Sequence, residues 1–446
     1  MDIELENANN PESPPETTKN SSKKSSGLEA TKKPSPDVKK SGLASVDFKN
    51  LRCTRKDFHL SLLMTLVTFG DAVEIYLPGV ITQYASRELG VSQAEEGMLG
   101  IILYLCLGIS YFILPVIKDM VGKKTALLAS LYVSILATVL CSLVPNYWTL
   151  LASRALLGLC IGLNMAMMGA YFTEEISGQD MYNVGTVSGL FAFTLGGGWI
   201  AVLGYLLLGK IGWRYFIVCS SLPVFLPPIF LLHCVLTERT EEERTQLYSD
   251  EKTEEVEITG FWGRLIKGSL VNFINTLQGW GSILLIPALL SYINKERNSL
   301  TDKQQLLILA LLYGVAKLLG RILSIFLLKY IAFRILQPLL SIFIALSYLS
   351  LIFLNQNLTA ITVLAMGVAN MCFCVTRCEL TLMEFDKHHF GTERLVLAAG
   401  VMSGCGMLGA VVGAVAAQFL SSYHAVIFTF VLSCVQVIVF CTITER

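Results

Sequence analysis

The chain has 446 residues, of which 53% are hydrophobic and 15% charged, and its mean hydropathy is +0.59. Soluble domains carry about 25% charged residues, so this composition excludes a soluble globular protein and indicates one that crosses a membrane many times. The formal net charge is zero, which argues against a nucleic-acid partner. No apolar run follows the first methionine, and we therefore expect no cleavable signal peptide.

The first 56 residues are rich in Ser, Lys, Pro and Glu, and they contain too few apolar side chains to form a core. This composition predicts a disordered cytosolic tail at 1–56. Twelve apolar runs of membrane-spanning length follow. We expect them at 58–82, 97–117, 124–144, 148–172, 184–208, 213–236, 264–292, 304–328, 331–354, 358–383, 394–419 and 421–443.

A stretch dominated by glutamate, 237–263, separates the first six runs from the last six. The predicted fold is therefore an all-α membrane protein of twelve transmembrane helices. It consists of an N-terminal six-helix bundle (57–236), a cytosolic acidic linker (237–263) and a C-terminal six-helix bundle (264–446). Basic residues concentrate in the connections on the side of the N-terminus, which predicts that both termini are cytosolic. The expected location is the plasma membrane or the membrane of an intracellular vesicle.

Two acids lie just past the middle of the first run, where Asp71 and Glu74 share one helix face. A carboxylate at mid-bilayer costs about 2.5–3.5 kcal/mol on insertion scales, so both must face protein or water. They predict a proton or cation site beside a central cavity; the alternative is a neutralised pair that joins neighbouring helices. Because Glu74 lies one turn further outward, depth alone assigns the proton to Glu74 and an ion pair to Asp71.

Several motifs resemble those of the major facilitator superfamily. The connection KDMVGKKTAL resembles its D-x-x-G-[RK]-[RK] signature, and SRALLGLCIG resembles its R-x-x-x-G-x-x-x-G helix. AYFTEEI resembles a Y-x-x-E element, with Glu174 as the match. GWRYF is similar to the opening of the sixth helix in the synaptic-vesicle-2-related and organic ion transporter branches, and DAVE is similar to a sequence of the synaptic-vesicle-2-related branch. The residues to which these motifs imply gating or structural roles are Asp119, Gly122, Lys123, Lys124, Arg154 and Glu174.

One departure from the family pattern concerns the second copy of the loop signature, LLKYIAFR, which lacks the expected Asp and Gly. A weakened cytosolic latch favours a rival hypothesis, a receptor, scaffold or vesicle-trafficking protein on the same fold. Arg377 and Glu379 form another candidate latch near the cytosol.

In this family, substrates bind near mid-membrane between the two bundles. The resemblance therefore implies that polar side chains of the spans line a substrate or proton site. The candidates are Asp71, Glu74, Asn164, Asn272, Asn275, Gln278, Trp280, Lys317 and Arg321. The Asn/Gln row of the seventh run has an alternative role, since polar side chains also join helices to one another.

Lys317 and Arg321 lie four residues apart on one helix face, where like charges repel. Something negative must therefore face them. Asp71 and Glu74 could provide that charge through a salt bridge between the bundles, and an anionic substrate is the alternative.

Together these features predict a secondary transporter of a small organic solute, such as an organic ion, with proton symport as a hypothesis. No Walker phosphate loop is present, so ATP is not the expected energy source. Catalytic and metal-ligating patterns are absent from the sequence, and we expect no enzyme activity, cofactor or metal. The expected partners are the solute, protons and the lipid bilayer, and the expected state is a monomer.

Overall fold

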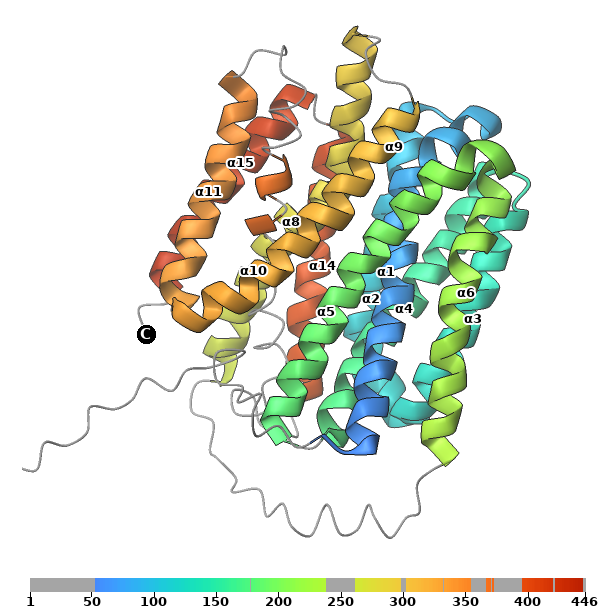
Figure 1. Cartoon of the computed structure of the whole chain (residues 1–446), viewed down its shortest axis with the longest axis vertical. Helices are drawn as coiled ribbons and strands as arrows, with labels where there is room; N and C mark the ends of the chain where they lie inside the picture. Colours follow the sequence, from blue (N-terminus) through green and yellow to red (C-terminus); the bar gives the residue numbers. More distant parts are fainter. Residues whose placement is uncertain are drawn as a thin grey trace, which may run out of the picture. The chain divides into compact units, whose positions relative to one another are not determined.

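A computed structural model of the chain describes residues 53–176, 178–237, 261–297, 302–331, 333–353, 366–369, 371–372, 395–419 and 422–443. This part is nearly all helical (Figure 1). Its elements are α1 (Arg55–Leu89), α2 (Gln93–Val121), α3 (Lys123–Leu143), α4 (Tyr147–Glu175), α5 (Gly178–Leu203), the π-helical turn η2 (Gly204–Leu208), α6 (Gly209–Thr237), α8 (Phe261–Arg297), α9 (Asp302–Ala310), the π-helical turn η3 (Leu311–Ala316), α10 (Lys317–Tyr330), α11 (Phe333–Phe353), α14 (Leu395–Phe419) and α15 (Ser422–Ile443).

Helices α1 and α2 extend several residues beyond the predicted apolar runs, and their N-capping residues lie outside those runs. Thr54 caps α1, and its hydroxyl accepts from the Asp57 amide while the Asp57 carboxylate accepts from the Thr54 amide. Ser92 and Glu95 form the same reciprocal box at the start of α2. Such boxes satisfy backbone N–H groups that have no partner inside the helix. Helix α1 ends at Gly90, whose φ of 65° is the left-handed conformation that glycine adopts readily.

Seven helical stretches among the described residues are long and apolar enough to cross a membrane. One of them, Met181–Val235, covers most of α5 and of α6. Gly212, with φ of 76°, breaks the helical path near the start of α6. Large apolar side chains such as Met120, Phe230 and Ile438 are exposed, as lipid-facing positions are. The all-helical membrane class is confirmed; the twelve-span count stays a prediction, because most of 358–383 lies outside the described residues.

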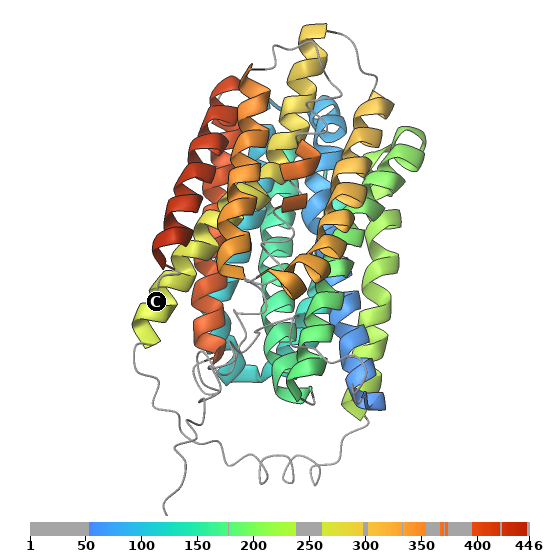
Figure 2. The ribbon, with the colours of Figure 1, turned by 60° about the vertical axis from the view of Figure 1, so that its left-hand side comes forward.

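The helices before residue 237 pack mainly on one another. Helix α1 contacts α4, α5 and α6, while α4 contacts α2 and α3 (Figure 1). After residue 261, α8 packs on α14 and α15, and α15 lies beside α11 (Figure 2). Helices α6 and α8 end and begin at Thr237 and Phe261, the two edges of the predicted linker. The linker itself and the predicted N-terminal tail lie outside the described residues.

Among the described residues, several contacts connect these two sets of helices. Helix α2 contacts α14, α5 contacts α9, η3 and α10, and α1 contacts α8. Small residues allow the close approach of α5 and η3, where a Cβ built on Gly198 of α5 would lie 3.0 Å from the Cα of Gly314 in η3. The side chains beside these contacts are therefore the place to look for a site shared by both sets.

Candidate functional site

The two acids of α1 face α3 and α4. Asp71 and Glu74 are both fully buried. Their described hydrogen bonds run to Thr138 of α3 and to Arg154 and Asn164 of α4. The face of α1 that carries Asp71 and Glu74 therefore packs against α3 and α4.

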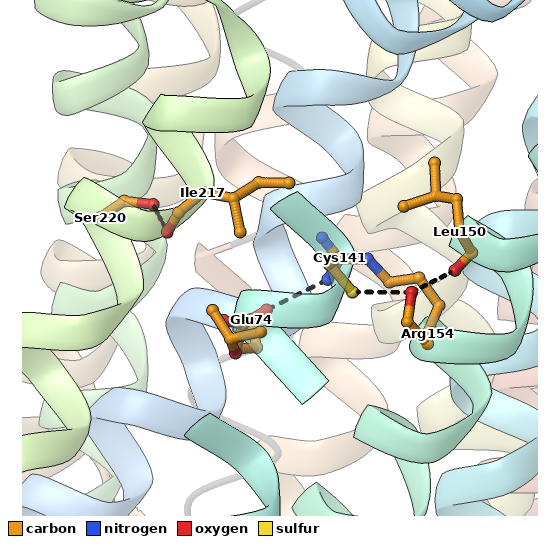
Figure 3. Close-up of polar contacts among 8 residues, drawn as sticks. Glu74, Cys141, Leu150, Arg154, Ile217 and Ser220 are labelled. Atoms are coloured by element: carbon orange, nitrogen blue, oxygen red, sulfur yellow. Dashed lines mark hydrogen bonds and ion pairs between the residues drawn. The ribbon is translucent and has the colours of Figure 1, made fainter. Parts of the chain in front are cut away.

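Glu74 forms a buried ion pair with Arg154, the arginine of the R-x-x-x-G-x-x-x-G motif. The Arg154 Nη1 donates to Glu74 Oε2 over 3.1 Å, and the two side chains are only 1% and 0% exposed (Figure 3). Thr138 Oγ1 donates to the other oxygen, Oε1, over 2.8 Å. The prediction from depth alone, which gave the ion pair to Asp71 and the proton to Glu74, is corrected in this respect: the ion pair lies at Glu74.

Asp71 is held by a neutral side chain. Asn164 Nδ2 donates to Asp71 Oδ1 over 3.0 Å and to Ser134 Oγ over 3.2 Å. Ser130 Oγ donates to the Asn164 carbonyl over 2.5 Å. The second oxygen of Asp71, Oδ2, is buried and has no hydrogen-bond partner in the part of the chain that the structure describes. The carboxyl group thus has one oxygen available for a further partner.

Lys317 is buried where α10 meets α1. Its Nζ donates to the Tyr76 hydroxyl over 2.7 Å. The same ammonium lies 4.8 Å from the ring centre of Tyr76 and 5.4 Å from that of Tyr313. Contacts of this kind between a cation and the face of an aromatic ring are attractive. Lys317 does contact the first span, but this hydrogen bond ends on a phenol. The two alternatives from the sequence were a salt bridge to Asp71 or Glu74 and an anionic substrate.

Tyr76 and the acids point to different sides of α1. Tyr76 follows Glu74 by two positions, roughly 200° around an α-helix. The hydrogen bond of Lys317 therefore lies on the opposite side of α1 from the Glu74–Arg154 pair. Glu74 and Lys317, which one hypothesis from the sequence paired with each other, are thus on different sides of this helix. Arg321, one turn further along α10, is buried as well, with 3% exposed.

Five aromatic side chains surround this joint, and we call them the central aromatic cluster. They are Tyr76 of α1, Tyr104 of α2, Phe193 of α5, Trp280 of α8 and Tyr313 of η3. Ring centres are separated by 5.0 Å for Tyr76–Tyr313, 5.7 Å for Tyr76–Phe193, 5.5 Å for Phe193–Trp280 and 5.7 Å for Tyr104–Trp280. Through these ring contacts the cluster joins α1, α2 and α5, which lie before residue 237, to α8 and η3, which lie after residue 261.

The prediction from sequence found Trp280 and missed the four other members of this cluster. A signal was present, because Tyr76, Tyr104 and Tyr313 lie inside apolar runs, whereas membrane tyrosines are enriched at the interfaces with water. Tyr104 shows the consequence most clearly. Its hydroxyl is buried and has no hydrogen-bond partner among the described residues.

The Asn/Gln row of α8 faces α14 and α15. Asn272 Nδ2 donates to the Met402 carbonyl over 2.8 Å. Asn275 accepts from Gln436 over 3.5 Å, and Gln278 donates to the Ser433 hydroxyl. These contacts join helices to one another, as the alternative interpretation of the row expects.

The loop signature lies where α2 passes into α3. Asp119 is exposed in the last turn of α2, and Gly122 joins the two helices with φ of 78°. Lys123 and Lys124 begin α3, and the Lys124 Nζ lies 5.4 Å from the ring centre of Tyr171. Glu174 belongs to the last turn of α4. Arg377 and Glu379 lie outside the described residues, so their predicted latch stays a prediction.

Metal ligation has no support in the described part of the chain, where no group of three or more His, Cys, Asp and Glu side chains could hold an ion. Nine cysteines of the described part of the chain are free thiols. What the described side chains offer is a paired acid, a second acid with an open oxygen, and a buried ammonium among aromatic rings.

Comparison of the chain with known proteins identifies its family. The model of the Major Facilitator Superfamily matches residues 60–414. Synaptic vesicle glycoprotein 2A of Rattus norvegicus is 28% identical over 162 residues, which are 36% of this chain and 22% of that protein. Synaptic vesicle glycoprotein 2B of Mus musculus is 29% identical over 161 residues, or 36% of this chain and 23% of that protein. The match thus spans less than a quarter of the length of these relatives.

Solved structures of transporters share the fold. The xylose transporter XylE from E. coli, in a partially occluded inward-open conformation, matches with a TM-score of 0.70 and 14% identity over 87% of this chain and 100% of that chain. The human organic anion transporter MFSD10 (TETRAN) matches with a TM-score of 0.62 and 14% identity over 86% and 99%. The resemblance inferred from the sequence motifs is confirmed. Because the family model covers most of its length, this chain belongs to the Major Facilitator Superfamily.

Proposed function

We propose that this protein is a secondary transporter that carries a small organic anion across the membrane by alternating access. One observation carries the proposal: the buried Lys317 ammonium hydrogen-bonds Tyr76 and lies over the Tyr76 and Tyr313 rings, where α1 meets η3 and α10. A cation at the joint between the two sets of helices lies where transporters of this kind hold their substrates.

The chemistry of the central aromatic cluster indicates the kind of solute. Small-molecule sites are lined mainly by apolar and aromatic side chains, with a few polar groups that fix orientation. Here the rings would contact the body of the solute, and Lys317 would hold its carboxylate or other anionic group. The buried hydroxyl of Tyr104 supplies one more group for hydrogen bonding.

The two related structures support a transport function, but they do not favour one class of substrate. One is named an organic anion transporter and the other a xylose transporter, so the fold accommodates both charged and neutral solutes. The buried ammonium of Lys317 favours an anionic solute for this chain. The Tyr76 and Tyr313 rings beside the ammonium favour a solute that also has an apolar or aromatic part.

Uptake into reconstituted vesicles, with a panel of organic anions and neutral solutes, tests the proposal. Lys317→Gln should raise KM for transported anions about 10- to 100-fold, since a hydrogen bond to a charged group contributes about 1.5–3 kcal/mol. Neutral solutes should show no comparable loss. Lys210→Gln is the matched control, because Lys210 is an exposed lysine of α6 and its loss should leave KM unchanged.

Two outcomes would contradict the proposal. Uptake of neutral solutes alone, with equal rates for the wild type and Lys317→Gln, would remove the anion assignment. Absence of uptake across the panel, with the protein folded and inserted, would instead favour the alternative of a receptor or vesicle-trafficking protein on the same fold.

The loop signature gives a second prediction for the transporter. We assume that Asp119 forms an ion pair across the cytosolic face in only one state of the transport cycle. An exposed ion pair contributes up to about 1 kcal/mol, so its loss in Asp119→Asn should slow turnover about two- to fivefold. KM should stay nearly unchanged, because Asp119 lies at the end of α2 and away from the central aromatic cluster. Initial uptake rates measure both quantities. Asp119→Glu keeps the charge and serves as the control; unchanged turnover in Asp119→Asn would show that this residue forms no latch.

A further inference from the structure

We propose that water molecules are bound in a buried polar site between α8, α11 and α15. Four amide side chains carry the inference, and we call them the amide cluster: Asn275 and Gln278 of α8, Gln337 of α11 and Gln436 of α15. All four are buried, yet five of their amide atoms have no hydrogen-bond partner in the described part of the chain. We call these five atoms open. The inference does not depend on the proposed transport function, because it concerns a different site.

The amides of α8 and α15 lie against each other. Gln436 Nε2 donates to Asn275 Oδ1 over 3.5 Å, and Gln278 Nε2 donates to the Ser433 hydroxyl. Residues three apart share one face of a helix, so a polar face of α8 meets a polar face of α15. These contacts leave three open atoms at the interface, namely Asn275 Nδ2, Gln278 Oε1 and Gln436 Oε1.

Gln337 approaches from α11, which packs along α15 (Figure 2). The start of α11 and the end of α15 lie at the same end of this set of helices (Figure 1). Gln337 is four positions into α11, and Gln436 is seven positions from the end of α15. A rise of 1.5 Å per residue puts both at roughly 6–11 Å from those helix ends, hence at similar depth. Both amide atoms of Gln337 are open.

So many open atoms in one place call for a ligand. Burying an amide without a hydrogen-bond partner is costly, and the large majority of buried polar side-chain atoms have a partner in the protein or in ordered water. Buried waters typically make about three hydrogen bonds to groups that the protein leaves unpaired. The five open atoms of the amide cluster offer enough partners for such waters.

The chemistry of the open atoms selects a neutral ligand that both donates and accepts. They comprise the NH₂ groups of Asn275 and Gln337 and the carbonyl oxygens of Gln278, Gln337 and Gln436. Gln337 offers both kinds by itself, so exchanging O and N in any amide leaves both kinds at the site.

A charged ligand would lack compensation in this place. Helix α15 contains no Asp, Glu, Lys or Arg, and α8 contains none from Gly268 to Asn294. A buried charge without an opposite charge is strongly unfavourable. Water, which is neutral and has two donors and two acceptor lone pairs, fits the site better than an anion or a metal cation.

The site lies behind α8 as seen from the central aromatic cluster. Trp280 follows Gln278 by two positions, roughly 200° around the helix. Trp280 contacts the Tyr104 and Phe193 rings, so the amide cluster lies on the opposite side of α8 from these contacts. The waters would therefore fix the back of α8 to α11 and α15, while its front carries Trp280.

The sign of a stability change tests the proposal. Gln337→Met replaces the amide with an apolar side chain of similar length. If waters are bound, the variant loses their hydrogen bonds, and its melting temperature in detergent should fall by about 1–3 °C. If the amide has no partner, removing it relieves an unfavourable burial, and the melting temperature should rise.

Two variants calibrate the measurement. Leu340→Met changes a buried apolar residue of α11 into the same side chain, and its melting temperature should stay within about 1 °C of the wild type, because the swap conserves volume. Asn272→Leu removes the hydrogen bond from Asn272 Nδ2 to the Met402 carbonyl, which is 2.8 Å long. Its melting temperature should fall whatever the amide cluster binds.

An experimental structure of the wild type that shows ordered waters provides the direct test, and it remains available if a variant fails to fold. We expect density within hydrogen-bond distance of Gln337 and of at least one other open amide atom. Absence of density there overturns the proposal, as does a higher melting temperature for Gln337→Met. Density for an ion or an organic molecule overturns it too, because the ligand would then not be water.

Discussion

Replacing Arg154 with methionine is expected to lower the free energy of unfolding by about 3–5 kcal/mol, because it leaves the Glu74 carboxylate buried without its partner. Glu74 is fully buried and its Oε2 accepts from Arg154. The double variant Glu74→Leu with Arg154→Met should recover most of the loss, since apolar groups of similar volume can replace a buried pair. Unfolding in detergent can be followed with a thiol-reactive dye, which reports exposure of the buried Cys141 and Cys160.

An exposed ion pair provides the control for this result. Arg214 pairs with Glu88 in the last turn of α1, where the two side chains are 31% and 53% exposed. Arg214→Gln should cost no more than about 1 kcal/mol. Hydrogen bonds from Trp213 and Arg214 lower the pKa of Glu88, so this small contribution is present at neutral pH and disappears as pH falls through the lowered pKa. A loss for Arg154→Met as small as that for Arg214→Gln would contradict a buried, uncompensated Glu74.

Adding methyl groups at Gly158 and Gly162 is the second change with a large expected effect. A Cβ on Gly158 would lie 2.5 Å from the Leu103 carbonyl oxygen, and one on Gly162 would lie 2.7 Å from the Leu107 carbonyl oxygen. Both atoms belong to the backbone of α2, so α2 and α4 must separate. Overpacking of this kind costs about 1–3 kcal/mol or more per site, and we expect Gly158→Ala with Gly162→Ala to lower the melting temperature in detergent clearly.

Gly209→Ala is the matched control for these two changes. No atom lies within 4 Å of a Cβ built on Gly209, and its φ of −73° suits any residue. Its melting temperature should match that of the wild type or exceed it, because alanine restricts the unfolded chain more than glycine does. A melting temperature of the Gly158→Ala variant equal to that of Gly209→Ala would contradict the close packing of α2 on α4.

The same glycines show how far the sequence predicts the fold. Apolar run lengths predict where the described helices lie along the chain, because the length of an apolar run is a local property. The R-x-x-x-G-x-x-x-G spacing of Arg154, Gly158 and Gly162 is visible in the sequence as a family motif. The sequence does not say that α2 is the neighbour, since that depends on contacts between residues far apart in the chain.

The candidate site shows the limit more sharply. Asp71, Glu74 and Lys317 are identified from sequence because charges inside apolar spans are costly and few. Their partners are not, because depth along a helix does not give the direction in which a side chain points. In the structure, Glu74 pairs with Arg154 and Lys317 hydrogen-bonds Tyr76. Neither partner follows from the depth of these residues along their helices. The aromatic residues around Lys317 look like ordinary core positions in the sequence.

The π-helical turn η3 separates α9 from α10 at Leu311–Ala316. Such a turn holds one residue more than the α-helical path needs, so every position after it is rotated by about 100° relative to an uninterrupted helix. A gap-free alignment of this helix with a relative that lacks the turn is therefore displaced by one residue from Lys317 onward. Charges at positions 317 and 321 correspond to those of such relatives only after an insertion is placed within 311–316. The side of the helix on which Lys317 meets Tyr76 depends on that single extra residue.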